Sequence, residues 1–189
     1  MVNHGPLNEE DPYRKTSIVH QWLFGYEVPD TVLLLRKDGA LYFLGTKKKV
    51  DFLQPSVDQL KQPKSSSSSS IKITLLQRNK EDNNAANYDT LWNEAVTSIA
   101  FKNGNNNKKR ALGLILKEQA DNRQAGGIVG PWENRLYDAS KDTDDVKSSV
   151  QLVDIASGIA FVMSVKDDAE LDLMKVSCQL LSRLLACHA

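Results

Sequence analysis

Apolar residues along this chain gather in short runs that polar corners separate. Val32–Leu35 and Leu41–Leu44 are two such runs, and Lys37-Asp38-Gly39 joins them. Runs rich in Val, Leu, Tyr and Phe that are bounded by turn residues predict a β-hairpin. Asp38-Gly39 supplies the positive φ that a tight turn needs. The early part of the chain therefore contains a pair of antiparallel strands.

The segment Thr46–Leu53 follows the hairpin and has a helical period. Thr46 is a suitable N-cap, and Val50 and Leu53 share one face. Lys47, Lys48 and Lys49 would then point to water. Charge runs are usually solvated helix faces. The other interpretation is a basic patch for an acidic or nucleic-acid partner, and the residues leave both open.

Strand and helix patterns alternate through the rest of the chain. The predicted strands are Ile71–Leu76, Ala111–Leu116 and Val150–Ile155, and the predicted helices are Tyr88–Phe101, Ile128–Tyr137, Ala156–Val165 and a final segment capped by Asp167 or Asp168. We expect Trp92 to belong to the core. Alternating strands and helices predict an α/β fold with a layered sheet flanked by helices. The hairpin makes that sheet mixed.

Composition shifts divide the chain. Residues 1–15 are polar, with two prolines, and predict a disordered lead-in. Residues 16–166 form the α/β domain, and residues 167–189 form the C-terminal helix. Within the domain, prolines and the tract Ser65–Ser70 predict a flexible insertion over residues 54–70. The tract is either an inert expansion or a phosphorylation target flanked by lysines.

Balanced charge limits the classes of partner. The 189 residues carry 24 basic and 24 acidic side chains, so there is no global attraction to nucleic acid. Binding of that kind would be weak and would need a local patch, for which the candidates are Lys47, Lys48, Lys49, Lys108, Lys109 and Arg110.

The cysteines and the apolar runs bear on location. Cys178 and Cys187 form no disulfide framework, which favours a reducing compartment. The first residues lack the apolar core of a signal peptide. No apolar run approaches the roughly 20 residues that a membrane span needs. We therefore expect an intracellular protein without a membrane partner.

Catalytic chemistry has no evident basis in the sequence. His4, His20 and His188 show no metal-ligand spacing. Ala125–Gly130, AGGIVG, lacks both the Lys-Ser/Thr and the spacing of a phosphate loop, so a turn opening a helix is the preferred interpretation. Acid pairs such as Asp144–Asp145 lie in predicted loops. The sequence thus predicts no enzyme, cofactor, metal or small-molecule substrate.

Two long anchors carry a family resemblance. They are Trp22-Leu23-Phe24-Gly25-Tyr26-Glu27, continued by Pro29-Asp30-Thr31 and Lys47–Leu53, and Val153–Gly158, continued by Val165–Lys175. In order and spacing, they resemble the N-terminal peptidase-like domain of the large subunit of the FACT histone chaperone. The resemblance covers most of residues 13–186, although residues 54–145 match only in pattern.

The resemblance implies the first lobe of a two-lobed module, similar to the non-catalytic lobe of creatinase and aminopeptidase P. It implies a non-catalytic chromatin interaction module that acts in nucleosome reorganisation during transcription, replication and repair. Histones and other FACT, replication or transcription components would be its partners, in the nucleus and on the chromosome. The helix that starts near Asp167 is similar to the connection between the lobes.

One departure from the family concerns the start of the chain. The family lobe opens with a helix and a strand before the Trp22 region, and residues 1–15 are too few and too polar to replace them. We therefore expect an incomplete lobe with an unpaired sheet edge. We also expect an exposed apolar face around Trp22 and Phe24.

Two other interpretations stay open at this point. The chain is alternatively the non-catalytic N-terminal lobe of a metallopeptidase related to creatinase, prolidase or aminopeptidase P. A downstream lobe with two Asp, one His and two Glu ligands would favour that enzyme, whereas an acidic tail would favour the chaperone. The third interpretation is a truncated copy without function.

Overall fold

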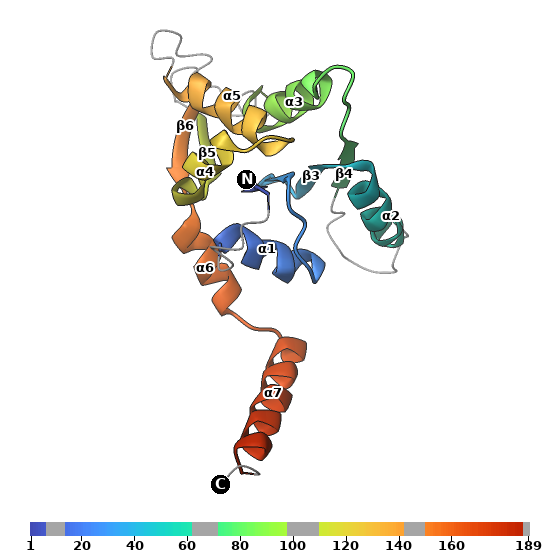
Figure 1. The fold of residues 1–189 in the computed structure, drawn as a ribbon, viewed down its shortest axis with the longest axis vertical. Helices are drawn as coiled ribbons and strands as arrows, with labels where there is room; N and C mark the ends of the chain where they lie inside the picture. Colours follow the sequence, from blue (N-terminus) through green and yellow to red (C-terminus); the bar gives the residue numbers. More distant parts are fainter. Residues whose placement is uncertain (7–13, 62–71, 98–109, 142–149, 187–189) are drawn as a thin grey trace. The chain divides into compact units, whose positions relative to one another are not determined.

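A computed structural model describes residues 1–6, 14–61, 72–97, 110–141 and 150–186. The chain divides into two compact units, Met1–Ala156 and Ser157–Ala189. Each is described by itself below (Figure 1).

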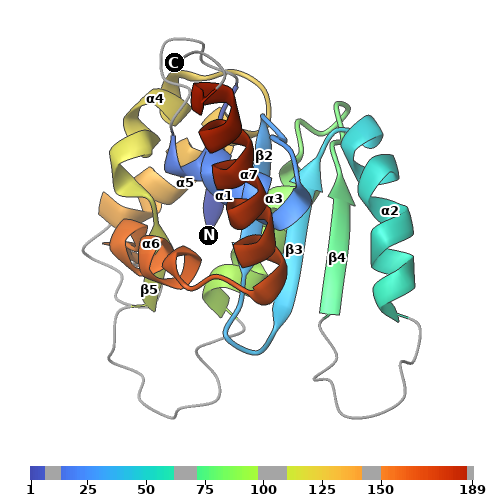
Figure 2. The same cartoon turned by 90° about the horizontal axis from the view of Figure 1, so that it is seen from below.

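A four-stranded mixed sheet organises the first unit. Its order is β1-β2-β3-β4, with β1 at Val2–His4, β2 at Thr31–Leu35, β3 at Ala40–Gly45 and β4 at Lys72–Gln77. β1 and β3 both run antiparallel to β2, and β4 runs parallel to β3. The crossover between β3 and β4 is α2, Lys47–Lys61, which packs along β4 (Figure 2).

A second sheet pairs β5, Arg110–Leu114, with β6, Val150–Asp154, in parallel. The remaining elements of this unit are helices: α1 at Lys15–Phe24, α3 at Ala85–Trp92 with a π-helical turn at Asn93–Thr97, a short 3-10 turn at Leu116–Glu118, α4 at Gln119–Gln124 and α5 at Val129–Lys141. The predicted α/β fold, a mixed sheet flanked by helices, is confirmed.

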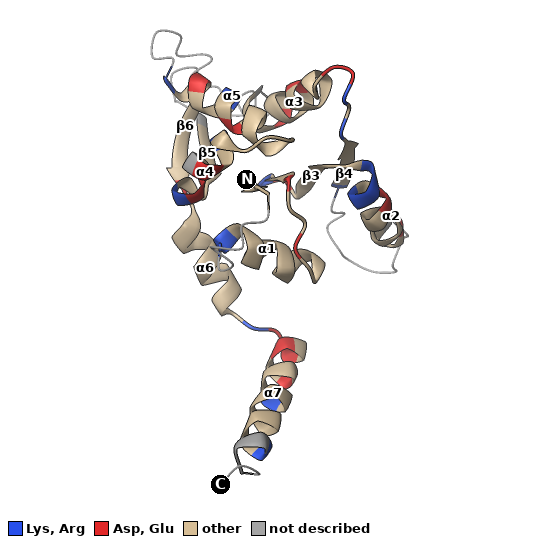
Figure 3. Cartoon of the chain, viewed as in Figure 1, with Lys and Arg blue, Asp and Glu red and all other residues tan. Residues whose placement is uncertain are grey.

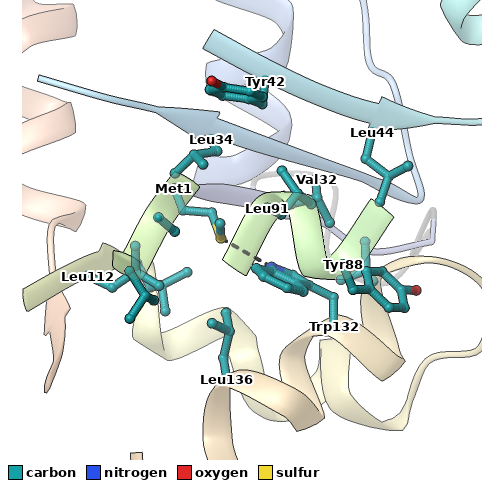
Figure 4. Packing of buried hydrophobic residues seen from close by; sticks show 14 of the residues in the cluster. Met1, Val32, Leu34, Tyr42, Leu44, Tyr88, Leu91, Leu112, Trp132 and Leu136 are labelled. Atoms are coloured by element: carbon teal, nitrogen blue, oxygen red, sulfur yellow. Dashed lines mark hydrogen bonds between the residues drawn. The ribbon is translucent and has the colours of Figure 1, made fainter. Parts of the chain in front are cut away.

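The core fills one face of the four-stranded sheet, beneath α3 and α5 (Figure 4). Trp132 is fully buried there and stacks on Tyr88, with ring centroids 5.7 Å apart. The Tyr88 hydroxyl donates to the Ile128 carbonyl at 2.8 Å, so this polar group is satisfied inside the core. Trp92 packs against the same cluster, as predicted.

The opposite face of the sheet is aromatic and polar. A chain of edge-to-face contacts runs from His4 through His20 and Phe24 to Phe43, with centroids 4.8 to 5.8 Å apart. Residues on alternate positions of a strand face opposite sides, so Phe43 points to this face while Tyr42 and Leu44 point to the core. Helix α1 covers this face with its buried residues Thr16, Ser17, Val19 and His20.

The second unit contains α6, Ala156–Ser164, except for its first residue, and α7, Asp168–Ala186. A reciprocal capping box opens α7. The Glu170 N–H donates to the Asp167 carboxylate at 2.7 Å, and the Asp167 N–H donates to the Glu170 carboxylate at 3.0 Å. Apolar side chains on two sides of α7 are exposed: Leu171, Met174 and Leu181, and Leu173, Val176 and Leu180. No described helix is long and apolar enough to cross a membrane.

The predicted disordered lead-in at residues 1–15 is wrong at both of its ends. Val2–His4 pair with Leu33–Thr31 as strand β1, and α1 already begins at Lys15. The prediction assumed that the polar residues at this end of the chain are exposed. Asn3 and His4 are buried, because Asn3 donates to Glu133 at 2.6 Å and His4 bonds the Gly5 carbonyl at 2.9 Å. Residues 7–13 lie outside the described residues.

The sheet edge beside β2, which was predicted to be unpaired, is occupied by strand β1. The expected apolar face is only partly present, because Phe24 is half-buried between His20 and Phe43 while Trp22 is exposed.

The predicted insertion at residues 54–70 is wrong over its first part. Helix α2 continues to Lys61 and passes through Pro55. Val50, Leu53 and Val57 recur at helical spacing and are buried, so packing of this face outweighs the backbone bond that the proline removes. Residues 62–71, which include the serine tract, lie outside the described residues.

Candidate interaction surface

The basic surface predicted at Lys47–Lys49 lies on the first turn of α2 (Figure 3). The Thr46 carbonyl accepts the N–H groups of Lys49 and Val50, each at 3.0 Å, so the helix starts where the sequence indicates. The first turn contains no acidic residue. Lysines at the positive end of a helix dipole are unfavourable by a few tenths of a kcal/mol each, about 0.3 or more. The start of α2 is therefore a locally positive surface.

The three lysines differ in environment. Lys47 and Lys48 are exposed, as expected. Lys49 is half-buried, and its ammonium donates to the Pro29 carbonyl. Burial lowers the pKa of Lys49, Asp30 opposes that effect, and Arg78 adds to it. Lys49 thus fastens α2 to the segment before β2, while Lys47 and Lys48 stay accessible to a partner.

The second predicted basic patch, Lys108–Arg110, lies mostly outside the described residues. Lys108 and Lys109 lie outside the described residues, and Arg110 begins β5. The binding role of both patches stays a prediction.

Asp30 occupies the anion-binding position at the start of α5. Its carboxylate accepts the N–H of Ile128 at 2.7 Å and that of Val129 at 3.2 Å, and Arg78 lies 3.9 Å away. A Cβ added at Gly127, where φ is +84°, would stand 2.6 Å from the Asp30 oxygens. Ala125–Gly130 is thus a turn that leads into helix α5. The Asp30 carboxylate already accepts the N–H groups that could otherwise bind an anion.

Two aromatic rings adjoin the lysines, and sequence analysis did not single them out. Phe52 and Tyr26 meet edge to face, with centroids 4.8 Å apart and planes at 76°. Phe52 is 61% exposed, and burial raises the pKa of Tyr26. The signal for Phe52 was available, because it lies off the buried face of α2 and one turn after Lys48.

A comparable cation–aromatic group lies on α4 and α5. The Arg123 guanidinium carbon is 3.9 Å from the centroid of the Tyr137 ring, and the Lys141 ammonium is 4.1 Å from it. Hydrogen bonds from Lys141 and Arg123 lower the pKa of Tyr137. The exposed Tyr137 ring is thus contacted by two cations.

The arrangement that most resembles a catalytic site is formed by Ser17 and the buried histidines His4 and His20. Ser17 Oγ lies 3.2 Å from His4 Nε2, and His4 Nδ1 lies 2.9 Å from the Gly5 carbonyl, as in a nucleophile and its base. Burial lowers the pKa of His4, and burial together with the His4 ring lowers that of His20 to about 3. Because Ser17 and His4 are both buried, a substrate has no access to the hydroxyl.

Glu133 is the other strongly perturbed group. It is buried and accepts hydrogen bonds from Asn3 at 2.6 Å and from Gln119 at 2.9 Å. Burial raises its pKa to about 7 against the opposing effect of these donors. Among the described residues, no group of three His, Cys, Asp or Glu side chains could hold a metal ion.

Comparison with known proteins identifies the lobe. A sequence profile of the FACT complex subunit SPT16 N-terminal lobe domain matches residues 1–158. The chain belongs to this family. Among similar SPT16 proteins, that of Kluyveromyces lactis is 30% identical over 173 residues, and that of Dictyostelium discoideum is 31% identical over 185 residues. These alignments cover 92% and 97% of this chain, but 14% and 15% of the relatives.

Solved SPT16 N-terminal domains share the fold. The domain from Eremothecium gossypii aligns with a TM-score of 0.64 at 26% identity, over 88% of this chain and 33% of the other. The domain from Cicer arietinum aligns with a TM-score of 0.63 at 20% identity, over 90% of this chain and 33% of the other, and supports the fold alone. The chain spans about a seventh of the length of its curated SPT16 relatives.

Proposed function

We propose that this chain is a non-catalytic chromatin interaction module, the N-lobe of a FACT-type histone chaperone large subunit. The module would act in nucleosome reorganisation during transcription, replication and repair. The observation that carries the proposal is the SPT16 N-terminal lobe match over residues 1–158. The 21 significant matches among curated proteins include SPT16 relatives from fungi, nematodes, a plant and an amoeba.

The proposed partners are histones and other FACT, replication or transcription components, and the proposed location is the nucleus. Relatives named as FACT complex subunits support both statements. Direct nucleic-acid binding would be weak, because the formal net charge is zero and exposed charges interact over only about 8–10 Å at physiological salt.

The metallopeptidase alternative has less support. In that alternative the chain is also a non-catalytic lobe, but the family profile and the curated relatives named above are SPT16 proteins. We expect no cleavage of proline-containing peptides and no stoichiometric Mn or Zn after dialysis. One tightly held metal ion per chain together with cleavage would overturn the proposal in favour of the enzyme.

Histone binding gives the positive test. Fluorescently labelled core histones titrated with the chain should show binding weaker than about 1 μM that declines strongly between low and physiological salt. Lysozyme, a basic protein unrelated to chromatin, serves as the control for charge alone. Equal binding of histones and lysozyme would remove the support for a chaperone module.

A further inference from the structure

The outer face of α2 combines exposed charge with an exposed ring. The buried residues Val50, Leu53 and Val57 fix which side of the helix meets the sheet. Lys48 and Phe52 are four residues apart, so they lie one turn apart on the side that faces away from those residues. Both are exposed. Phe52, the largest apolar side chain on this face, is 61% exposed.

Phe52 is held in place although it is exposed. The Tyr26 ring packs against it edge to face, and Tyr26 comes from the segment that follows α1. Such an aromatic pair contributes about 0.5–1.5 kcal/mol beyond the area that it buries. A ring that is already positioned loses little conformational freedom when a ligand covers it, so it suits a binding contact.

Two exposed lysines lie on the first turn of α2, before Phe52. Lys47 and Lys48 are exposed, and no ion pair joins either lysine to a described carboxylate. Asp51 is the exposed acid on the same two turns of α2. Glu27 follows Tyr26 in the sequence, and Asp30 is already bonded to the start of α5 and paired with Arg78.

We propose that Lys47, Lys48, Phe52 and Tyr26 form a docking site for an acidic protein segment that carries an apolar side chain. The apolar side chain covers the Phe52 ring, and carboxylates on the segment meet the two lysines. The inference names a partner chemistry for one surface of the proposed chromatin module and rests on that function.

An acidic peptide fits this surface better than a nucleic acid does. Proteins that hold a phosphate backbone by charge typically make about 6–10 phosphate contacts, and this face offers two free lysines. Burial of an aromatic ring provides affinity that does not depend on salt. The site therefore derives affinity from Phe52 and orientation from Lys47 and Lys48.

The test uses the whole chain and a labelled peptide of alternating Asp and Glu with a central Leu pair. Phe52→Ser should weaken binding by about tenfold or more, and Lys48→Glu should weaken it by about threefold or more at low salt. A peptide with Ser in place of both Leu residues should bind as weakly to the wild-type chain as the Leu peptide binds to Phe52→Ser.

Tyr137→Ser and Lys141→Glu are matched controls. They change an exposed aromatic–lysine pair with the same four-residue spacing on α5 and should leave peptide binding unchanged. Thermal unfolding of each variant checks the fold. Phe52 is mostly exposed, so its replacement should not prevent folding, and Lys48→Glu tests the surface independently.

Several results would overturn the docking site. They are no binding of the Leu peptide, equal binding of the Ser peptide, or Phe52→Ser binding like the wild type. Preferential binding of a DNA duplex would assign the lysines to nucleic acid instead. Core histones measured on the same samples separate the two proposals, because histone binding without peptide binding would reject the docking site alone. Peptide binding without histone binding would reject the chaperone function alone.

Discussion

The carboxylate of Glu118 accepts the Thr16 hydroxyl at 2.6 Å, across 102 residues of sequence. It also accepts the Lys15 N–H at 2.7 Å, while Arg14 at the N-cap position makes no side-chain capping bond. Glu118 is therefore the functional cap of α1, supplied by the segment that follows β5. A negative charge at this end also suits the helix dipole. The contact joins the N-terminal helix to the 3-10 turn that follows β5.

Removal of this cap should destabilise the first unit. Glu118→Ala leaves buried N–H and hydroxyl donors without their acceptor, so we expect the free energy of unfolding to fall by about 1–3 kcal/mol. Glu118→Gln keeps an acceptor and should lose less. Urea denaturation measures both variants, with exposed Glu81→Ala as the control. Equal stability of Glu118→Ala and the control would show that the cap contributes nothing.

Asp30 should be similarly sensitive, because it caps α5 from the start of β2. Asp30→Ala loses both N–H contacts and should lower the free energy of unfolding by about 1–2 kcal/mol. Gly127→Ala should destabilise independently, since its Cβ meets the Asp30 carboxylate and its φ is +84°. In the double variant the steric part of the Gly127→Ala loss should shrink, because the carboxylate is gone. Strict additivity in thermal unfolding would contradict this coupling.

The sequence predicted those elements whose pattern depends on neighbours in the chain. The hairpin, α5 and the alternation of strands with helices follow from local periodicity and turn residues, and they are present. β1 could not be predicted in this way. Asn3 is buried, and its partners lie more than 100 residues later: Glu133 accepts its side-chain N–H, and Asn122 donates to its main-chain carbonyl. Long-range polar pairing leaves no periodic signal, so a buried polar strand resembles a loop.

The candidate surface shows the same limit. Local sequence located the lysines at the start of α2, but it could not tell that Lys49 turns inward to Pro29. Nor could it place Tyr26 against Phe52, since that contact joins the segment after α1 to α2. Charge runs are visible in a sequence, whereas the apolar groups beside them depend on the packing of separate elements.

Glu133 should give the first unit an unusual dependence on pH. Its folded pKa of about 7 exceeds the ordinary value of 4.5, so the folded protein holds this proton more tightly than the unfolded chain. The resulting stabilisation is full below pH 4.5 and is lost as the pH rises through about 7. Neutral Glu133→Gln has no such loss, so the stability of the variant relative to wild type should rise over that range, by at most about 3 kcal/mol.

Denaturation at pH 4.5, 6 and 8 checks this expectation. The charged groups that influence Glu133 are Arg123, which opposes the rise in its pKa, and the Met1 amine, whose own pKa burial lowers to about 6. A stability difference between Glu133→Gln and wild type that is constant with pH would show that Glu133 does not titrate in this range.

His20 should act in the opposite sense. Its pKa of about 3 lies below the ordinary 6.5, so the stability that it contributes is present above pH 6.5 and is lost as the pH falls toward 3. Burial is the main cause of the low pKa, followed by the His4 ring and Lys49, while the Val28 carbonyl opposes them.

Neither ring nitrogen of His20 makes a hydrogen bond of ordinary geometry to a described residue. His20→Leu, of similar volume, should therefore cost less than about 1 kcal/mol at pH 7. At pH 4 it should be more stable than wild type, because the variant has no imidazole whose protonation in the unfolded chain favours unfolding. His4→Leu is the contrasting variant: it removes the contacts to Ser17 and Gly5 and should cost about 1–2 kcal/mol at pH 7. Acid denaturation followed by circular dichroism distinguishes the two, and an unchanged acid midpoint for His20→Leu would place the acid sensitivity in other groups.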